Sequence, residues 1–177
     1  GSSLATGDFN VDGKTDVAVG ANLAAGNVGR VYIFYSQNGQ VNTNQSILGV
    51  ATSDQFGIAL TTGDFNADGR TDLAVGADGY SSSTGRAYIF YGDGQIPTTA
   101  ATADVTITGN ATGDKFGASL VSGDLNADGK TDLAIGGWGY SSTTGRVYIF
   151  YNDGSIPTTA GTADVTITGA STSDAFG

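Results

Sequence analysis

The sequence predicts an all-β protein made of three similar four-stranded antiparallel units. Three observations support this fold class: the composition, an internal repeat, and a strand segment that is apolar on both faces. The chain has 177 residues, enough to enclose a hydrophobic core. It is rich in glycine, aromatic and β-branched residues and contains no Met and no Glu, a composition that favours strands over helices.

An internal repeat divides the chain into three units. The segment GDFNVDGKTDVAVG begins at Gly7, and close variants begin at Gly63 and Gly123, after 56 and 60 residues. The second and third units agree at 42 of 60 positions, and the first unit is four residues shorter. We therefore expect a single domain over residues 1–177, with units at about 1–56, 57–116 and 117–176.

Each unit contains four segments with strand character, separated by clusters of Gly, Asn, Asp and Ser. In the third unit these segments are GASLVSGDL, DLAIGG, RVYIFY and DVTITG, in this order along the chain. RVYIFY begins at Arg146 and is apolar on both faces, so its sheet needs cover on both sides. A four-stranded unit packed between copies of itself is a β-propeller blade.

An FG pair accompanies the repeat at Phe56, Phe116 and Phe176. Together with GDFNADGRTDLAVGA and GRVYIF, this pattern resembles the FG-GAP repeat of integrin α-subunit propellers and related bacterial surface proteins. The resemblance covers essentially the whole chain, with its motifs three times in register. It implies a β-propeller that carries calcium in hairpin loops of its blades, usually on an extracellular protein.

The loop after the first strand of each unit concentrates oxygen ligands. In the second unit, Asp64, Asn66, Asp68 and Asp72 occupy loop positions 1, 3, 5 and 9, around a glycine at position 6. Calcium binds six to eight such oxygens, and the backbone carbonyl of position 7 adds another. The loop is not an EF-hand, because position 12 is Val75 and an EF-hand has a bidentate Glu there.

We therefore predict one calcium ion per blade and three per chain. The alternative is an Asp/Asn-rich turn without metal, but three copies in the same phase favour the metal site. Magnesium fits less well because it prefers small octahedral sites rich in water. The predicted ligands are Asp8, Asn10, Asp12, the carbonyl of Lys14, and Asp16; Asp64, Asn66, Asp68, the carbonyl of Arg70, and Asp72; and Asp124, Asn126, Asp128, the carbonyl of Lys130, and Asp132.

The charge and the missing residue types exclude several function classes. The net charge is −10 and all 17 acidic residues are Asp, so we expect no nucleic-acid partner, which would require clustered Lys or Arg. The chain has no long apolar run, so we expect no membrane insertion. His and Cys are absent, which removes the commonest general base and any Cys-based zinc site or disulfide. We expect no enzyme, and a carboxylate-only glycosidase or lyase ranks last.

The sequence favours a calcium-binding, non-catalytic recognition or adhesion module that is extracellular or on a cell surface and binds an unidentified protein or glycan. Weak calcium sites of the extracellular kind would be largely empty in the cytosol. Two alternatives remain: a structural repeat that assembles other domains, and a lectin that uses Trp138 or Tyr140. Arg30, Arg86 and Arg146 open the third strands, where we expect a repeated ion pair or carbonyl contact.

Counting blades predicts an assembly. Propellers close with four to eight blades, so three blades form a half-domain with an uncovered apolar face at each end. A twofold homodimer would give a six-bladed ring of about 35 kDa from two chains of 17.7 kDa. The alternative is that the chain is an excerpt from a longer propeller.

Overall fold

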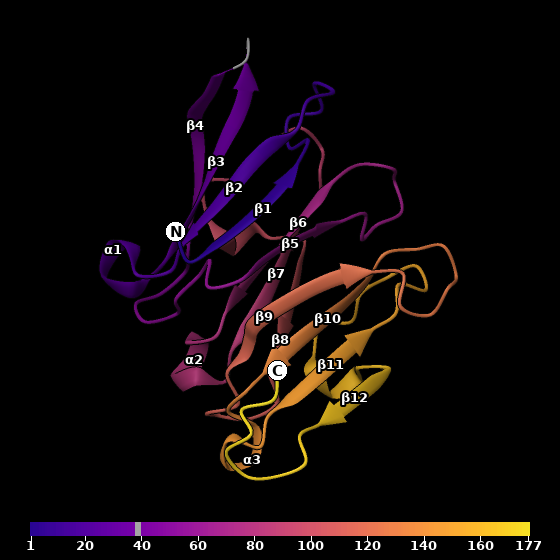
Figure 1. The fold of residues 1–177 in the computed structure, drawn as a ribbon. Helices are drawn as coiled ribbons and strands as arrows, with labels where there is room; N and C mark the ends of the chain where they lie inside the picture. The colour runs from indigo at the N-terminus through magenta and orange to yellow at the C-terminus, as the bar shows by residue number, and fades with distance from the viewer. Residues whose placement is uncertain (38–39) are drawn as a thin grey trace.

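Three four-stranded antiparallel sheets make up the computed structural model, which describes residues 1–37 and 40–177 (Figure 1). Within each sheet the strands follow chain order, so each sheet is one consecutive stretch of the chain. This confirms the predicted fold class of three propeller blades. The strands are β1 (Ser3–Gly7), β2 (Asp16–Ala21), β3 (Arg30–Gln37) and β4 (Gln40–Leu48); β5 (Leu60–Gly63), β6 (Asp72–Ala77), β7 (Arg86–Phe90) and β8 (Val105–Thr108); and β9 (Phe116–Gly123), β10 (Asp132–Gly137), β11 (Arg146–Phe150) and β12 (Val165–Thr168).

The four strand segments predicted for the third unit all form, with small differences at their ends. β11 ends at Phe150, one residue before the end of the predicted segment. The cause is the side chain of Asp164, which accepts a hydrogen bond from the Tyr151 N–H at 2.8 Å. That N–H is therefore not available to the ladder between β11 and β12, and an equivalent contact follows β7 in the second sheet.

Short turns join the second strand of each sheet to the third. In α2 (Tyr80–Ser83), Ser81 and Ser82 have φ of 47° and 57°, in the left-handed region that residues other than glycine rarely adopt. A hydrogen bond of 3.0 Å from the Gly85 N–H to the Tyr80 carbonyl closes this turn. No helix in the described ranges is long and apolar enough to cross a membrane. The other short helical segments are α1 (Ala24–Asn27), α3 (Tyr140–Thr143), η1 (Ala100–Thr102) and η2 (Ala160–Thr162).

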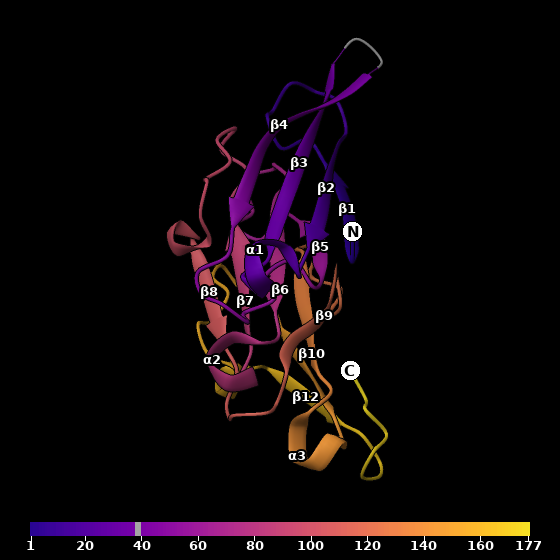
Figure 2. The same ribbon diagram turned by 90° about the vertical axis from the view of Figure 1, so that its left-hand side faces the viewer.

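The sheets follow one another with their first strands side by side, β1 against β5 and β5 against β9 (Figures 1 and 2). The segment that leads into each new sheet first pairs with the previous one. Phe56 forms a parallel bridge with Gly29, and Phe116 forms one with Gly85. The first two FG pairs therefore each lie at a junction between two blades.

The hydrophobic core lies between the sheets, in two clusters. At the first junction, Phe56 packs edge-on against Tyr88 and Phe90, with ring centroids 5.4 and 6.3 Å apart. Phe116 makes the equivalent pair of contacts at the second junction, at 5.2 and 6.5 Å. β7 is buried along nearly its whole length, whereas β3 and β11 each leave some side chains half-buried. The two-sided cover predicted for this strand is thus present in the middle sheet.

Candidate metal centre

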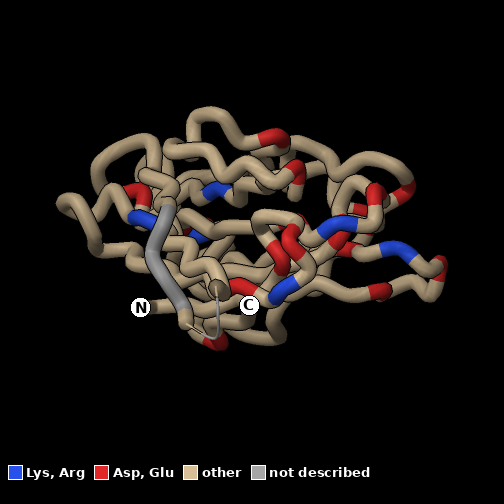
Figure 3. Tube along the Cα trace, turned by 90° about the horizontal axis from the view of Figure 1, so that it is seen from above, with Lys and Arg blue, Asp and Glu red and all other residues tan. Residues whose placement is uncertain are grey.

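The three acidic loops occupy equivalent positions, each between the first and second strand of its sheet. In Figure 1 the loop after β1 lies at the top and those after β5 and β9 lie on the right, at the ends of the sheets opposite the turns α1, α2 and α3. Seen from above, several of the acidic residues lie near a Lys or Arg along the trace (Figure 3). This placement follows from the repeat, because the three sheets have the same strand order and each loop joins the first strand to the second.

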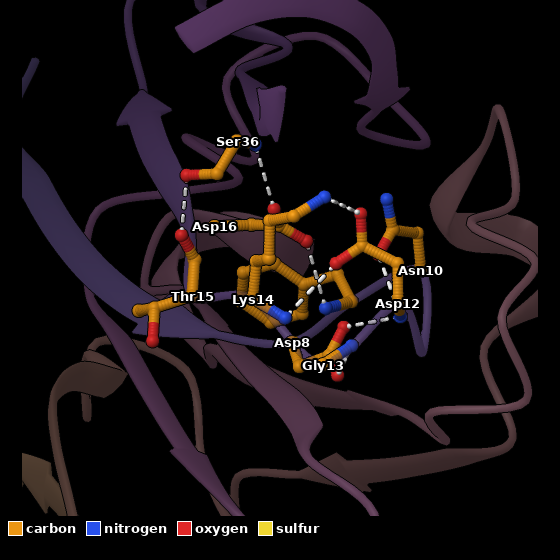
Figure 4. Close-up of polar contacts among 9 residues, drawn as sticks. Asp8, Asn10, Asp12, Gly13, Lys14, Thr15, Asp16 and Ser36 are labelled. Atoms are coloured by element: carbon orange, nitrogen blue, oxygen red, sulfur yellow. Dashed lines mark hydrogen bonds and ion pairs between the residues drawn. The ribbon is translucent and has the colours of Figure 1, made fainter. Parts of the chain in front are cut away.

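Within the first loop, the backbone is wrapped around the side-chain oxygens (Figure 4). Asp8 accepts the N–H groups of Asp12 and Gly13 at 3.0 and 2.8 Å, one on each carboxylate oxygen. Asn10 Oδ1 also accepts from Asp12, and Asp12 Oδ1 accepts from the Lys14 N–H at 2.9 Å. The loops at 64–72 and 124–132 repeat this pattern bond for bond. The N–H of Lys130 lowers the pKa of Asp128 in the third loop.

The aspartate at position 9 has a different role from the others. Asp72 is fully buried, and its two carboxylate oxygens accept the N–H groups of Phe65 at 2.7 Å and Gly92 at 2.8 Å. Burial raises the pKa of Asp72 while these two N–H groups lower it, and the charges of Asp68 and Asp64 raise it further. Position 9 therefore anchors the loop to the C-terminal end of the third strand, here to Gly92 just past β7. The equivalent residues Asp16 and Asp132 are bound in the same way.

The loop backbone needs two left-handed positions, of which the sequence indicates one. Gly69 at position 6 has φ of 83°, as expected for the residue that allows the sharp bend. Position 4 also has positive φ, but it holds Val11, Ala67 and Ala127 in the three loops, at 59°, 59° and 63°. A β-branched residue such as Val11 is unusual in this conformation, and no sequence signal marks it.

The donor set of each loop suits a hard cation. It consists of three carboxylates, one amide oxygen and a backbone carbonyl, the ligand types that calcium prefers. Within the described parts of the chain, however, no three carboxylates come close enough together to hold a metal ion. Positions 1, 3 and 5 instead contact the loop N–H groups, and position 9 is bound at the third strand. The fifteen predicted ligands, including the carbonyls of Lys14, Arg70 and Lys130, therefore stay a prediction.

Arg86 and Arg146, at the start of β7 and β11, stack on tyrosine rings, and among the described residues neither forms the expected ion pair or carbonyl contact. The Arg86 guanidinium lies 3.7 Å from the centre of the Tyr80 ring, and Arg146 lies 3.7 Å from that of Tyr140. Tyr140 therefore has one face covered by a cation. Trp138 is 37% exposed, and Lys115 Nζ lies 5.8 Å from its ring.

Comparison with known proteins identifies the repeat. The FG-GAP repeat family matches residues 1–34, 56–90 and 116–150. Integrin alpha-PS2 of Drosophila melanogaster is 33% identical over 162 residues, covering 85% of this chain and 11% of that protein. Integrin alpha-IIb of Mus musculus is 36% identical over 157 residues, covering 80% and 15%. Phosphatidylinositol-glycan-specific phospholipase D of Mus musculus is 34% identical over 147 residues, covering 75% and 17%. The chain thus spans less than a fifth of the length of these relatives.

Proposed function

We propose that this chain, which belongs to the FG-GAP repeat family, is a calcium-binding, non-catalytic recognition module of an extracellular or cell-surface protein. The observation that carries the proposal is the acidic loop, which recurs in all three blades with one hydrogen-bond pattern. Three carboxylates on one short loop repel each other, and a divalent cation removes that repulsion. The backbone N–H groups of each loop already hold the side-chain oxygens of positions 1, 3 and 5 towards that same loop. This arrangement suits an ion that binds oxygen ligands.

Calcium in these loops acts on stability rather than on chemistry. Extracellular modules bind calcium with dissociation constants of about 10⁻⁴ to 10⁻³ M. At millimolar calcium each site then contributes roughly 0.4 to 1.4 kcal/mol to the free energy of unfolding. Sites of this strength fill outside the cell and stay largely empty in the cytosol, so the proposed calcium function requires the extracellular location.

A non-catalytic role is supported by the mixture of relatives. Integrins and a phospholipase D share this repeat, so the repeat accompanies proteins with different activities, and function has to be argued from the site. The chain has no His and no Cys. The buried carboxylates of Asp54 and Asp114 cap turns by accepting the N–H groups of Ala51 and Ala111.

Calcium titration calorimetry tests the proposal. The wild-type chain is expected to bind three calcium ions and Asp68→Ala two, because Asp68 accepts the backbone N–H of position 7 and lies at the centre of its loop. Asp153→Ala removes an exposed acidic residue outside the loops and is expected to leave three ions bound. Equal stoichiometry in wild type and Asp68→Ala would overturn the ligand assignment, and no calcium uptake at all would overturn the function.

The ligand of the module is a protein or a glycan, and a glycan array separates the two. Trp138 is the exposed aromatic side chain that favours the lectin alternative. Retention of a defined sugar by wild type, with loss in Trp138→Ala, would establish the lectin. Binding that survives Trp138→Ala would exclude this residue as the sugar platform.

We further propose that two copies of the chain pair into the six-bladed ring. The two end faces carry opposite halves of the junction core. On the third blade, Phe176 is 39% exposed although Phe56 and Phe116 are fully buried. On the first blade, Tyr32 and Phe34 are half-buried although the equivalent rings of the other blades are buried. One end thus has the Phe without its two aromatic neighbours, and the other end has those neighbours without the Phe.

At one position, the proposed interface between the two chains differs from the junctions within the chain. Gly79 and Gly139 approach the neighbouring blade so closely that a Cβ atom would lie 1.9 and 2.0 Å from the carbonyl oxygens of Ser53 and Gly113. The first blade has Leu23 at this position, so the interface must open locally there. Leu23→Gly is therefore expected to strengthen the pairing.

Light scattering coupled to size exclusion tests the pairing. The expected mass is about 35 kDa, twice the 17.7 kDa of one chain. Leu4 and Ile167 are 69% and 46% exposed on the two end faces, so Leu4→Lys and Ile167→Lys are expected to give monomers. Val50→Lys, at a similarly exposed residue on neither end face, is the control. A wild-type chain that stays a sharp 17.7 kDa monomer at micromolar concentration would refute the ring.

A further inference from the structure

Equivalent residues at the end of β3 or just past β7 and β11 differ between blades in a way that concerns the acidic loops. In each blade the N–H of this residue donates to the position-9 carboxylate: Ser36 to Asp16, Gly92 to Asp72, and Asn152 to Asp132. This backbone bond is common to all three blades. The side chain of this residue is not shared, because serine, glycine and asparagine differ in length and in hydrogen-bonding groups.

Asn152 is fully buried and reaches into the neighbouring blade. Its Nδ2 donates to the carbonyl of Phe65 at 3.0 Å and approaches that of Asp64 at 3.5 Å. These two residues are positions 1 and 2 of the acidic loop in the second blade. A single side chain of the third blade therefore contacts the start of the second loop while its own backbone contacts the third loop.

The contacts of Asn152 join the two loops through hydrogen bonds. The peptide group between Asp64 and Phe65 presents its carbonyl to Asn152, and its N–H donates to Asp72 at 2.7 Å. At the other end, the Asn152 N–H donates to Asp132 at 2.9 Å. The two position-9 carboxylates of adjacent loops are thus connected through one buried asparagine, and buried networks of this kind reinforce one another.

The first two loops lack an equivalent bridge within the described residues. Ser36 Oγ donates to the Thr15 carbonyl of its own loop at 2.6 Å, and Gly92 has no side chain. Among the described residues, the second and third loops are therefore joined by a buried asparagine side chain, whereas the first and second loops are not. This difference is an internal control for any effect of the bridge.

We propose that Asn152 is a positioning residue that couples the second and third loops, so that calcium bound in one raises the calcium affinity of the other. The inference rests on the proposed calcium function. Calcium bound in either loop restricts the motion of its position-9 carboxylate and, through it, of the Asn152 side chain. The second ion then binds to a loop that is already ordered and loses less conformational entropy. By reciprocity the effect is equal in both directions. The first loop binds independently.

The test is a calcium titration followed by the backbone amide NMR signals of Gly13, Gly69 and Gly129. Each of these N–H groups donates to the position-1 carboxylate of its loop, so each signal reports one site. In the wild type, the Gly69 and Gly129 signals are expected to titrate together and more steeply than Gly13. In Asn152→Ser, calcium affinity at the second loop is expected to fall on the order of fivefold, with Gly13 unchanged.

Two further variants and a calcium-free measurement control the titration. Asn152→Gly installs the residue of the second blade and is expected to behave as Asn152→Ser. Asn22→Ser removes a side-chain hydrogen bond far from the loops, the 3.3 Å bond to Gln55, and is expected to leave the loops coupled. Without calcium, amide exchange at Phe65 is expected to quicken on the order of fivefold in Asn152→Ser, while Phe9 keeps its rate.

The outcomes separate this inference from the function on which it rests. Three bound ions with unchanged affinity at the second loop of Asn152→Ser would overturn the coupling and leave the calcium function standing. No calcium uptake by the wild type would overturn both. Unchanged exchange at Phe65 in folded Asn152→Ser would show that the bridge does not order the loop, which also overturns the coupling.

Discussion

The middle sheet and the first sheet have closely similar sequences but different burial. β6 is buried at all six residues, whereas β2 alternates between buried and half-buried positions. The difference comes from the neighbours, since the middle sheet has a blade on each side and the first sheet has one. Burial in this molecule is therefore a property of the junction and not of the blade, as expected for a chain of repeats stabilised by nearest-neighbour interfaces.

The largest expected effect contrasts two equivalent phenylalanines. Phe116→Ala removes a fully buried ring that packs on Tyr148 and Phe150, and we expect a loss of about 3–5 kcal/mol in the free energy of unfolding. Phe176→Ala at the open end is expected to cost less than about 1 kcal/mol in the monomer. Urea denaturation of the two variants measures both, and equal losses would show that position in the junction does not matter.

Calcium removal is expected to destabilise all three sheets to a similar extent, because the three loops share one geometry. We expect exhaustive chelation to lower the free energy of unfolding by roughly 1 to 4 kcal/mol in total at millimolar calcium, the sum of three weak sites. Magnesium should restore little of it. Melting curves with chelator, calcium and magnesium make the measurement. An unchanged melting temperature and circular dichroism spectrum after chelation would contradict the calcium assignment.

Much of this fold follows from patterns that act locally. The four strands of a blade are set by apolar segments such as RVYIFY, bounded by glycine and aspartate clusters, and the repeat then gives the number of sheets. The bend at Gly69 can also be predicted, because glycine adopts a backbone conformation with positive φ at little energetic cost. The predictions that held are those in which sequence neighbours determine the structure.

The features that sequence reasoning missed depend on contacts between distant residues. Asn152 and Phe65 are 87 residues apart, and nothing in either segment indicates the contact. The stacking of Arg86 on Tyr80 requires the left-handed turn of Ser81 and Ser82. A serine-rich segment does not predict this backbone conformation. The position-9 aspartate was predicted as a ligand, and its second role, tying the loop to the third strand, appears only when both are folded.

A smaller effect concerns the turn that carries this stack. The first blade has Ala24 where the second has Tyr80, so Arg30 has no ring at this position. Ala24→Tyr is expected to stabilise the protein by about 0.5–1 kcal/mol, the value of an exposed cation–π contact. Tyr80→Ala should lose a similar amount and Tyr80→Phe should be neutral, since the ring is retained. Urea denaturation decides, and a neutral Tyr80→Ala would show that the stack contributes nothing.

The smallest expected effect lies at one position of the middle blade that differs from both neighbours. Asp78 is buried, with Asn22 and Trp138 at the equivalent positions. Its Oδ2 lies 3.6 Å from Lys115 Nζ, and its Oδ1 has no hydrogen-bond partner among the described residues. Burial raises the pKa of Asp78, and Lys115 lowers it only in part.

A carboxyl group with a raised pKa favours folding in its protonated form. That contribution is complete below the unfolded pKa of about 3.9 and is lost as the pH rises through the folded value. At neutral pH, Asp78→Asn is therefore expected to stabilise the protein, by less than about 1 kcal/mol because Lys115 is partly exposed and loses its partner. The gain should shrink as the pH falls towards about 3, because Asp78 is then protonated in the unfolded chain as well. Urea denaturation at several pH values makes the comparison, and a loss of stability at neutral pH would mean that the pair with Lys115 outweighs the burial of the charge.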